Sequence, residues 1–329
     1  MKKLINGIDA ILGESLDGFA AAHADIVILG AERKFVRRRA LAPNKVQLIS
    51  GGGSGHEPLH AGFVGRGMLD AACPGQVFTS PTPDQMAAAA SDIDQGKGIL
   101  FIVKNYEGDV MNFEMAAEVA GMEVATILVD DDVAVEKSTY SIGRRGVAGT
   151  LIVEKIVGAA AETGADLAAL HALGKSVNSR TRSMGVALTS CTVPAAGKPT
   201  FTLAEDEMEM GVGIHGEPGR RRVKLASADA IAAEMVAAIV GDLAPSRGSE
   251  IILLLNGFGG TPLMELYLMF NSAQRVLASK GLTIAKSLVG SYVTSLDMAG
   301  CSITVSVLDD QAKQLWDAPV HTAALRWGV

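Results

Sequence analysis

Residues 46–58 have the sequence Val-Gln-Leu-Ile-Ser-Gly-Gly-Gly-Ser-Gly-His-Glu-Pro, and this stretch indicates the fold class. The apolar run from Val46 to Ile49 predicts a buried strand, and a glycine-rich segment follows it directly. Glycines at the C-terminal end of a parallel strand let backbone N–H groups approach a ligand, and open α/β sheets bind their ligands at such ends. A flexible turn is the alternative interpretation, although His56 and Glu57 are unusual in an ordinary linker.

Short apolar runs alternate with longer alanine-rich stretches along the chain, which is typical of an α/β fold. We expect two α/β domains, each a sheet flanked by helices, at residues 1–183 and 184–329, with a C-terminal tail that can return to the first domain. The boundary follows the polar stretch 178–183. The expected strands are Val46–Ile49, Ile99–Val103, Val124–Val129, Val186–Leu188, Ile251–Leu255, Leu288–Val293 and Ile303–Leu308. The expected helices are Val147–Ala161 and Asp166–Ser179, with further helix starts at Gly108, Ser227 and Thr261.

The composition excludes several classes of protein. The 329 residues are 48% hydrophobic and 20% charged, which excludes intrinsic disorder as the main state. The net charge of −7 argues against binding to nucleic acid or to an anionic membrane, because both need a basic face. Cys73, Cys191 and Cys301 lie too far apart for a zinc ribbon, and no metal site is expected. Without a signal-peptide stretch or a long apolar run, we expect a cytoplasmic protein.

A second group of functional residue types occupies residues 104–109, Lys-Asn-Tyr-Glu-Gly-Asp. It places an ammonium, an amide and a carboxylate directly after an expected strand, where they can converge on one polar ligand. Asp109 also stands where the next helix is expected to begin. Its position is therefore equally consistent with a helix cap and with a catalytic base.

The third group occupies residues 210–219, Met-Gly-Val-Gly-Ile-His-Gly-Glu-Pro-Gly. Its glycines match the pattern GxGxxG, but a dinucleotide site needs a helix next, and Glu-Pro-Gly followed by three arginines does not suit one. What remains is His215, little hindered between glycines. A lone histidine in a loop is more often structural than catalytic.

Other features have simpler interpretations. The run Asp130 to Asp132 could bind magnesium, but a loop beside a solvated cluster of Arg144 and Arg145 explains it better. The arginines at 220–222 indicate a solvated loop. The tail that carries Trp316 and Trp327 either folds over a cleft or packs on the surface. The histidines that show no ligand spacing are His23, His60, His171 and His321.

The three groups, in this order, resemble the substrate-binding subunit of the dihydroxyacetone kinase family. The resemblance extends over almost the whole chain, and the pair GGGSGHEP and GIHGEPG is highly specific. The further matching segments are residues 78–84, 130–135, 143–146, 191–199 and 316–321. The resemblance implies two α/β domains in a homodimeric subunit, with a short ketose between the glycine loop and the histidine of the second domain.

Carried over by motif, the resemblance also implies site residues. His215 would bond covalently to the substrate carbonyl, and His56 and Asp109 would act as acid and base. The residues that would hold the substrate hydroxyls are Gly53, Ser54, Gly55, His56, Lys104 and Asp109.

The chemistry suits a histidine. A neutral imidazole, with an ordinary pKa near 6.5, can add a ring nitrogen to a carbonyl carbon and form a tetrahedral hemiaminal. A lysine adduct can lose water and become a Schiff base, whereas the ring nitrogen has no second proton to lose. The adduct should therefore stop at the hemiaminal. Glycerol has no carbonyl and cannot form this bond.

No GxxxxGK[ST] loop occurs in the sequence, so we expect this chain to bind no nucleotide or other cofactor itself. The resemblance implies that nucleotide and magnesium are held by an L-type partner subunit. That partner would be recharged by a phosphocarrier of the phosphotransferase system or would exchange ATP, and the sequence does not decide between the two donors.

The predicted activity is therefore that of a phosphotransferase subunit acting on dihydroxyacetone. A related alternative is a kinase subunit for erythrulose. A ketose-binding co-activator that signals to a transcription factor is an alternative from another class, and it could dispense with the acid–base pair. An aldolase or isomerase would depend on Lys104. The presence of both His56 and Asp109 favours the kinase.

Overall fold

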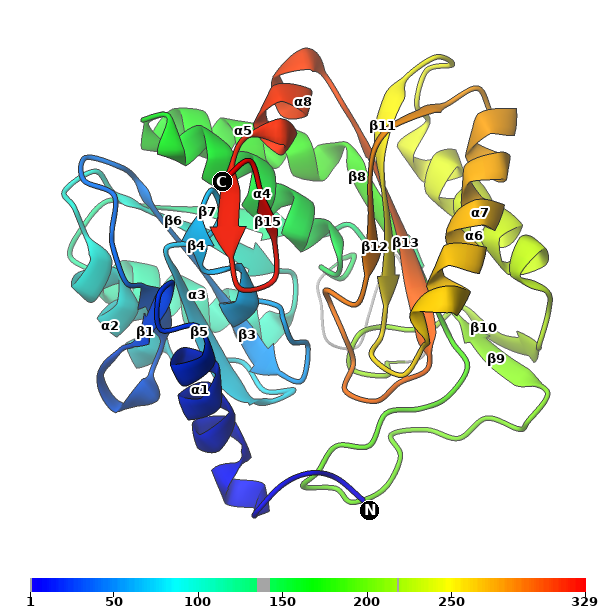
Figure 1. Cartoon of the computed structure of the whole chain (residues 1–329), viewed down its shortest axis with the longest axis horizontal. Coiled ribbons are helices and arrows are strands. Elements are labelled where there is room, and N and C mark those ends of the chain that lie inside the picture. The colour runs from blue at the N-terminus through cyan, green and yellow to red at the C-terminus, as the bar shows by residue number, and fades with distance from the viewer. Residues whose placement is uncertain (1, 135–142, 218) are drawn as a thin grey trace.

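The structure, a computed structural model, describes residues 2–134, 143–217 and 219–329 and contains two six-stranded sheets side by side (Figure 1). The expected α/β class, with two sheets flanked by helices, is confirmed. In spatial order, the first sheet consists of β1 (Val27–Leu29), β2 (Val36–Arg38), β5 (Ala71–Val77), β3 (Gln47–Ser54), β6 (Ile99–Lys104) and β7 (Val124–Val129). The second consists of β10 (Arg221–Lys224), β9 (Glu207–Met210), β8 (Thr181–Ala187), β13 (Gly300–Val307), β11 (Glu250–Gly257) and β12 (Thr283–Gly290).

The two sheets differ in strand direction. In the first sheet, β5, β3, β6 and β7 are parallel, and β2 and β1 complete the edge in antiparallel pairing. In the second sheet, every pair is antiparallel except β11 with β12. The glycine-rich segment therefore ends a parallel strand, β3, whose eight residues are all buried.

Helices form layers on the faces of both sheets. The α-helices are α1 (Ile11–Ala22), α2 (Pro83–Ile93), α3 (Glu107–Val119), α4 (Gly149–Glu162), α5 (Leu167–Ser179), α6 (Ala228–Leu243), α7 (Leu263–Ser279) and α8 (Asp310–Asp317). The short 3-10 helices are η1 (Ile8–Ala10), η2 (Ala31–Arg33) and η3 (Ala61–Phe63). Helices α2 and α3 pack on one face of the first sheet and α4 and α5 on the other, while α6 and α7 cover the outer face of the second sheet (Figure 1). Because α4 also contacts β8 and β13, it is buried from Gly149 to Ala161.

Two expected helix starts are confirmed by their caps. The side chain of Ser227 accepts a hydrogen bond from the N–H of Ala230 at the start of α6, and Asp166 does the same for Ala169 in α5. Such caps satisfy N–H groups that have no partner within the helix.

The expected strand Leu288–Val293 is wrong in its position, because β12 covers Thr283–Gly290. The side chain of Asn256, in β11, accepts hydrogen bonds from the N–H groups of Tyr292 and Val293 and donates one to the Val293 carbonyl. These bonds draw the chain out of the sheet after Gly290, and sequence periodicity carries no sign of them.

Two polar stretches of the sequence contribute to strands of the second sheet. Strand β8 begins at Thr181 and belongs to the second sheet, so the expected domain boundary after residue 183 falls inside a strand. The arginines at 220–222, expected in a loop, enter β10, which pairs with β9. In the structure, β8 pairs with β13 and β10 pairs with β9. These partner strands, and not the polar residues themselves, place both stretches in the sheet.

The C-terminal tail returns to the first half of the chain (Figure 1). Strand β14 (Val320–Thr322) pairs both with β15 (Arg326–Trp327) and with β4 (Gly65–Arg66). The rings of Trp316 and Trp327 lie 5.8 Å apart. The tail thus packs against the body of the protein.

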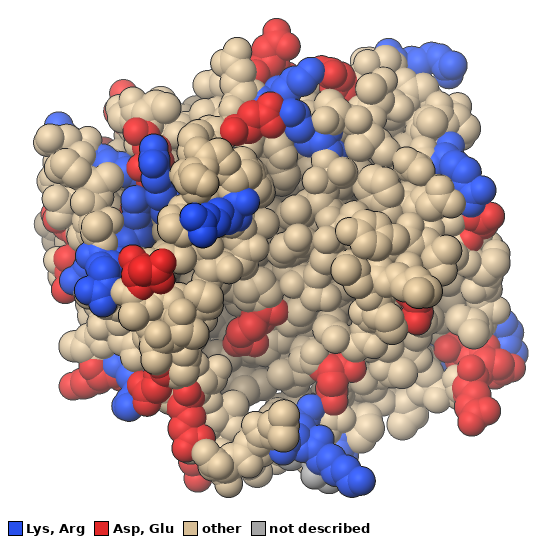
Figure 2. Space-filling model, in the orientation of Figure 1, with Lys and Arg blue, Asp and Glu red and all other residues tan. Residues whose placement is uncertain are grey.

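Charged side chains of both signs lie around the rim of the face in Figure 2, and uncharged residues cover most of its centre. Basic residues on this face stand beside acidic ones, whereas a nucleic-acid-binding surface gathers them into a stripe. Within the described ranges, no helix is long and apolar enough to cross a membrane.

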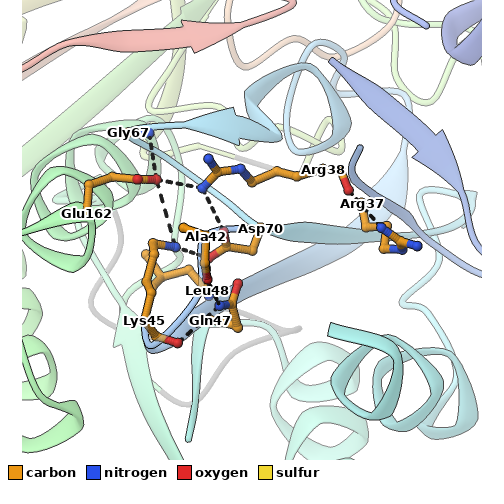
Figure 3. Close-up of polar contacts among 9 residues, drawn as sticks. All are labelled: Arg37, Arg38, Ala42, Lys45, Gln47, Leu48, Gly67, Asp70 and Glu162. Carbon is orange, nitrogen blue, oxygen red and sulfur yellow. Dashed lines mark hydrogen bonds and ion pairs between the residues drawn. The ribbon is translucent and has the colours of Figure 1, made fainter. Parts of the chain in front are cut away.

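A buried ion cluster joins the edge of the first sheet to α4 (Figure 3). Asp70, which is completely buried, accepts hydrogen bonds from Arg38, Lys45 and the backbone N–H of Leu48. Glu162 of α4 accepts a second bond from Arg38, at 2.5 Å. Two anions thus balance two cations, so that none of these charges is buried alone.

Replacing Asp70 with leucine should destabilise the protein strongly, because it leaves Arg38 and Lys45 without their shared anion. Breaking a buried pair on one side costs about 3–5 kcal/mol in the free energy of unfolding. Urea unfolding followed by circular dichroism measures the effect. The matched control is Asp17→Asn, which removes an exposed ion pair with Arg33 and should leave the unfolding curve nearly unchanged. Equal midpoints for the two variants would show that the cluster does not stabilise the fold.

Candidate active site between the two sheets

A cleft of about 650 Å³ lies between the two halves of the chain. A concave site of this size with a few convergent polar groups is typical of small-molecule binding. The first half contributes Gly53, Phe78, Ser80, Tyr106, Glu107, Gly108 and Asp109, and the second contributes Thr200, Phe201, His215, Gly216 and Glu217. Each of the three sequence groups therefore supplies part of the lining.

The glycines of β3 are required by close packing around this cleft. A Cβ atom on Gly52 would lie 2.3 Å from Nζ of Lys104, and one on Gly53 would lie 2.6 Å from the backbone nitrogen of Thr79. A larger residue at either position would displace Lys104 or the backbone next to Phe78.

His215 lies in the loop between β9 and β10 and is held by Glu217. Its Nδ1 lies 2.8 Å from Oε1 of Glu217, and its backbone N–H donates to Oε2 at 2.9 Å. Burial raises the pKa of Glu217, but the charge and hydrogen bond of His215, together with Arg145, lower that pKa to about 2. An ionised carboxylate can only accept hydrogen bonds. Nδ1 of neutral His215 therefore carries the hydrogen, and Nε2 keeps its lone pair.

Three aromatic rings fix the orientation of the His215 ring. The ring centroids of His56 and Tyr106 each lie 4.7 Å from it in edge-on contact, and that of Phe78 lies 5.1 Å away. Phe78 also stacks on His56 at 5.0 Å. Its φ of 56° is in the left-handed region, which side chains other than glycine rarely adopt and which is common at functional sites.

His56 is only 1% exposed, and its Nδ1 lies 2.7 Å from the Thr294 carbonyl. A carbonyl can only accept, so Nδ1 is the protonated nitrogen. Burial, followed by the charges of His215 and Lys104, lowers the pKa of His56 well below its usual value. His56 is therefore neutral near pH 7, and its Nε2, which has no partner among the described residues, is a free acceptor.

Asp109 is the third residue of α3, and its side chain makes no cap hydrogen bond to the helix start, since the N-cap position is Tyr106. Its Oδ2 lies 3.5 Å from Nζ of Lys104, and its Oδ1 is buried without a partner among the described residues. The hydroxyl of Tyr106 is also buried without a hydrogen-bond partner among the described residues. Buried polar atoms without partners are rare, so the presence of Tyr106 and Asp109 in the cleft lining, with His56 in contact with His215 beside it, indicates a ligand.

The other expected binding residues lie behind or beside this cleft. Ser54 Oγ donates to the Gly75 carbonyl, and Ser54 lines a second cavity of about 560 Å³. The backbone N–H of Gly55 donates to the Glu57 carboxylate. Lys104 is only 1% exposed and lies against Gly52.

Sequence reasoning gave no role to several residues that shape the site. Glu217 lies two positions after His215, and this short spacing could have predicted the hydrogen bonds between them. Phe78, which lies far from His215 in the sequence, carried no such signal. His60, dismissed for lack of ligand spacing, lies 2.9 Å from Nζ of Lys104.

The run Asp130 to Asp132 has a structural role. Asp131 accepts hydrogen bonds from N–H groups at the start of α4, and Asp132 pairs with Arg145. The expectation that Arg145 is solvated is wrong, because this pairing holds it completely buried. In the parts of the chain that the structure describes, no three His, Cys, Asp or Glu side chains are grouped to hold a metal ion. Val135 and Pro218 of the quoted motifs lie outside the described residues.

Two α/β halves with a polar cleft between them, lined by His215, Tyr106 and Asp109, define a protein with a site for a small polar ligand. Comparison with known families gives the more particular assignment: residues 17–324 match the Dak1 domain family, and the chain belongs to it. The predicted resemblance to dihydroxyacetone kinases is confirmed.

Two binding-subunit relatives match this chain over their whole length. The chain is 48% identical to the dihydroxyacetone-binding subunit of the PEP-dependent dihydroxyacetone kinase of Escherichia coli (strain K12), with both chains fully covered. It is 49% identical to the corresponding subunit of PTS-dependent dihydroxyacetone kinase 1 of Listeria innocua, covering 98% of this chain and 100% of that protein. Among solved structures, a dihydroxyacetone kinase operon co-activator is similar with a TM-score of 0.90 and 35% identity, covering 94% of this chain and 97% of that one.

Proposed function

We propose that this chain is the dihydroxyacetone-binding subunit of a multi-chain dihydroxyacetone kinase, and that it holds the ketose as a hemiaminal on His215. The observation that carries the proposal is the pairing of His215 Nδ1 with the Glu217 carboxylate, which leaves Nε2 as a nucleophile in the cleft.

Capture of the ketose begins when Nε2 of His215 adds to the carbonyl carbon. The N–C bond forms as the carbonyl π bond breaks, so that the ring gains positive charge and the oxygen gains negative charge. The Glu217 carboxylate, whose pKa of about 2 keeps it ionised, stabilises the charged ring. The oxygen then takes up a proton, and the adduct remains a hemiaminal because Nε2 has no hydrogen to lose.

Covalent capture explains how the site selects its substrate. Glycerol has similar hydroxyl groups but no carbonyl, so it cannot form the bond to His215. Discrimination then rests on a chemical step and not on a few hydrogen bonds.

His56 and Asp109 supply the acid–base chemistry in this proposal. Asp109 Oδ1 takes the proton of the terminal hydroxyl as that oxygen attacks the phosphoryl group, and His56 Nε2 accepts a hydrogen bond from the same substrate. Lys104, 3.5 Å from Asp109, balances the carboxylate charge. Gly53 lines the cleft, and Ser54 and Gly55 hold the loop that carries His56.

The phosphoryl group comes from a nucleotide with magnesium on an L-type partner subunit. The chain matches subunits of PEP-dependent and PTS-dependent kinases over the full length of both proteins, which favours a partner recharged by a phosphotransferase-system phosphocarrier over exchange of free ATP. The subunit acts as a homodimer in this proposal.

A ketose-binding co-activator is the second candidate function, because a structure with that name superimposes with a TM-score of 0.90. Capture by His215 would serve both functions. The unpaired atoms of His56 and Asp109 favour the kinase, since a protein that only binds the ketose needs no proton acceptor there.

The lone protein should bind dihydroxyacetone and show no turnover with ATP and magnesium, because the sequence holds no phosphate-binding loop. Triose phosphate should form once the L-type subunit and its phosphocarrier chain are added. A coupled assay for triose phosphate, run with dihydroxyacetone and with erythrulose, measures this.

The lone protein and the partner alone serve as controls. Robust product from the lone protein with ATP would contradict the divided kinase. Ketose binding without turnover in the complete mixture would favour the co-activator.

A further inference from the structure

A chain of buried polar groups leads from Lys104 away from the cleft. Nζ of Lys104 lies 2.9 Å from Nε2 of His60, and Nδ1 of His60 lies 2.7 Å from Oε1 of Glu154 in α4. All three residues are almost fully buried, and the reaction proposed above uses neither His60 nor Glu154. Burying charged or titratable side chains costs free energy unless they are paired, so a buried group of three indicates a structural or functional role.

The hydrogen bonds of Ser50 determine which nitrogen of His60 carries the hydrogen. Ser50 Oγ lies 2.6 Å from the Ile102 carbonyl, which can only accept, so the serine hydrogen is used there. The same Oγ lies 2.9 Å from Nδ1 of His60 and must accept from it. Nδ1 is therefore protonated, and Nε2 accepts a hydrogen bond from the Lys104 ammonium.

The titratable groups that face Lys104 are Asp109 of α3, His60 from the turn before η3, His56 after β3 and, through His60, Glu154 of α4. Burial lowers the pKa of His60 well below its usual value, so the imidazole is neutral. Asp109 is then the anion beside the lysine, and Glu154 adds a second negative charge above its pKa of about 8.

We propose that His60 and Glu154 are positioning residues of the ketose site, which fix the place of the Lys104 side chain beside Asp109. This rests on the proposed function, in which Lys104 balances Asp109 at the bound ketose. His60 connects the two side chains: its Nε2 accepts from Lys104, and its Nδ1 hydrogen is shared between Ser50 Oγ and Glu154 Oε1.

The pH dependence of ketose binding in Glu154→Gln tests the proposal. Burial raises the pKa of Glu154 to about 8, against the opposing effect of Lys104, so the carboxylate charge is lost as the pH falls through that value. Glutamine copies the neutral form. The variant should therefore bind dihydroxyacetone as the parent does near pH 6 and more weakly than the parent above about pH 8, where only the parent has the carboxylate charge that holds His60 and Lys104 in place.

Isothermal titration calorimetry with dihydroxyacetone at several pH values on either side of the Glu154 pKa of about 8 measures the effect. Lys155→Met is the matched control: Lys155 follows Glu154 in α4, is also buried, and bonds to the Leu315 carbonyl outside this chain of groups. Its binding profile should follow that of the parent. Glu154→Asp, which keeps the charge, should restore most of the alkaline limb.

The possible outcomes separate this inference from the proposed function. If the parent itself binds no ketose, the proposed function fails. If the parent binds and Glu154→Gln has the same pH profile, or is weakened equally at every pH, Glu154 is only structural and the inference is overturned.

A measurement on the unmutated protein covers the case in which Glu154→Gln does not fold. The ¹⁵N chemical shifts of His60 should show a hydrogen on Nδ1 and a lone pair on Nε2 near pH 7. A hydrogen on Nε2 would mean that Lys104 does not donate to His60, and that result would also overturn the inference.

Discussion

Replacing His215 with alanine is expected to abolish covalent capture of dihydroxyacetone and to reduce kinase turnover in the complete mixture by at least about a hundredfold, a loss on the scale of removing a group that acts directly on the substrate. The side chain is partly exposed and lies in a loop, so the fold should tolerate the truncation. With ¹³C-labelled substrate, the C2 signal should move from the carbonyl range to the tetrahedral range in the parent protein only.

The control is His171→Ala, which removes an imidazole that does not line the cleft. It should leave both capture and turnover at the parental level. A tetrahedral C2 that persists in His215→Ala would show that another residue bonds the substrate, and Lys104 would be the first to test.

Asp109→Asn is expected to separate binding from chemistry. The amide keeps the shape of the carboxylate but cannot take the proton of the terminal hydroxyl, so turnover should fall by about 10² to 10⁴ while ketose binding stays within a few fold. Steady-state kinetics of the complete mixture and calorimetry of the lone chain measure the two effects.

Glu107→Gln is the matched control, because Glu107 is also acidic, lies in the first turn of α3 and lines the same cleft, but is exposed. It should remain close to parental turnover. If Asp109→Asn also stays within about threefold of the parent, Asp109 only supports the first turn of the helix, which was the alternative that its sequence position left open.

The sequence determined the local parts of this protein. The apolar run before the glycines predicted β3, and Ser227 and Asp166 marked the starts of α6 and α5 where the structure has them. These features depend on residues within a few positions of one another. Periodicity and capping chemistry act over that range, so they can be recognised without the fold.

The motif order also identified the family, and with it the histidine, the aspartate and the glycine loop that meet at the cleft. The motifs did not show how deeply each of these side chains is buried or which hydrogen bonds it makes. The sequence position of Asp109 was equally consistent with a cap and a base, and the structure adds that its Oδ1 is buried without a partner among the described residues. Arg145 looked solvated because its neighbours in the sequence are polar, although Asp132 holds it in the interior.

Only the tertiary structure decided the electrostatics of the site. Thr294 orients His56 from 238 residues away, Glu154 meets His60 across 94 residues, and Asn256 ends β12 by binding the backbone of Val293. The sequence by itself determined which elements form and which residue types follow them. The structure alone decided which nitrogen is free and which charge is balanced, because burial and hydrogen bonding depend on neighbours that only the packed chain brings together.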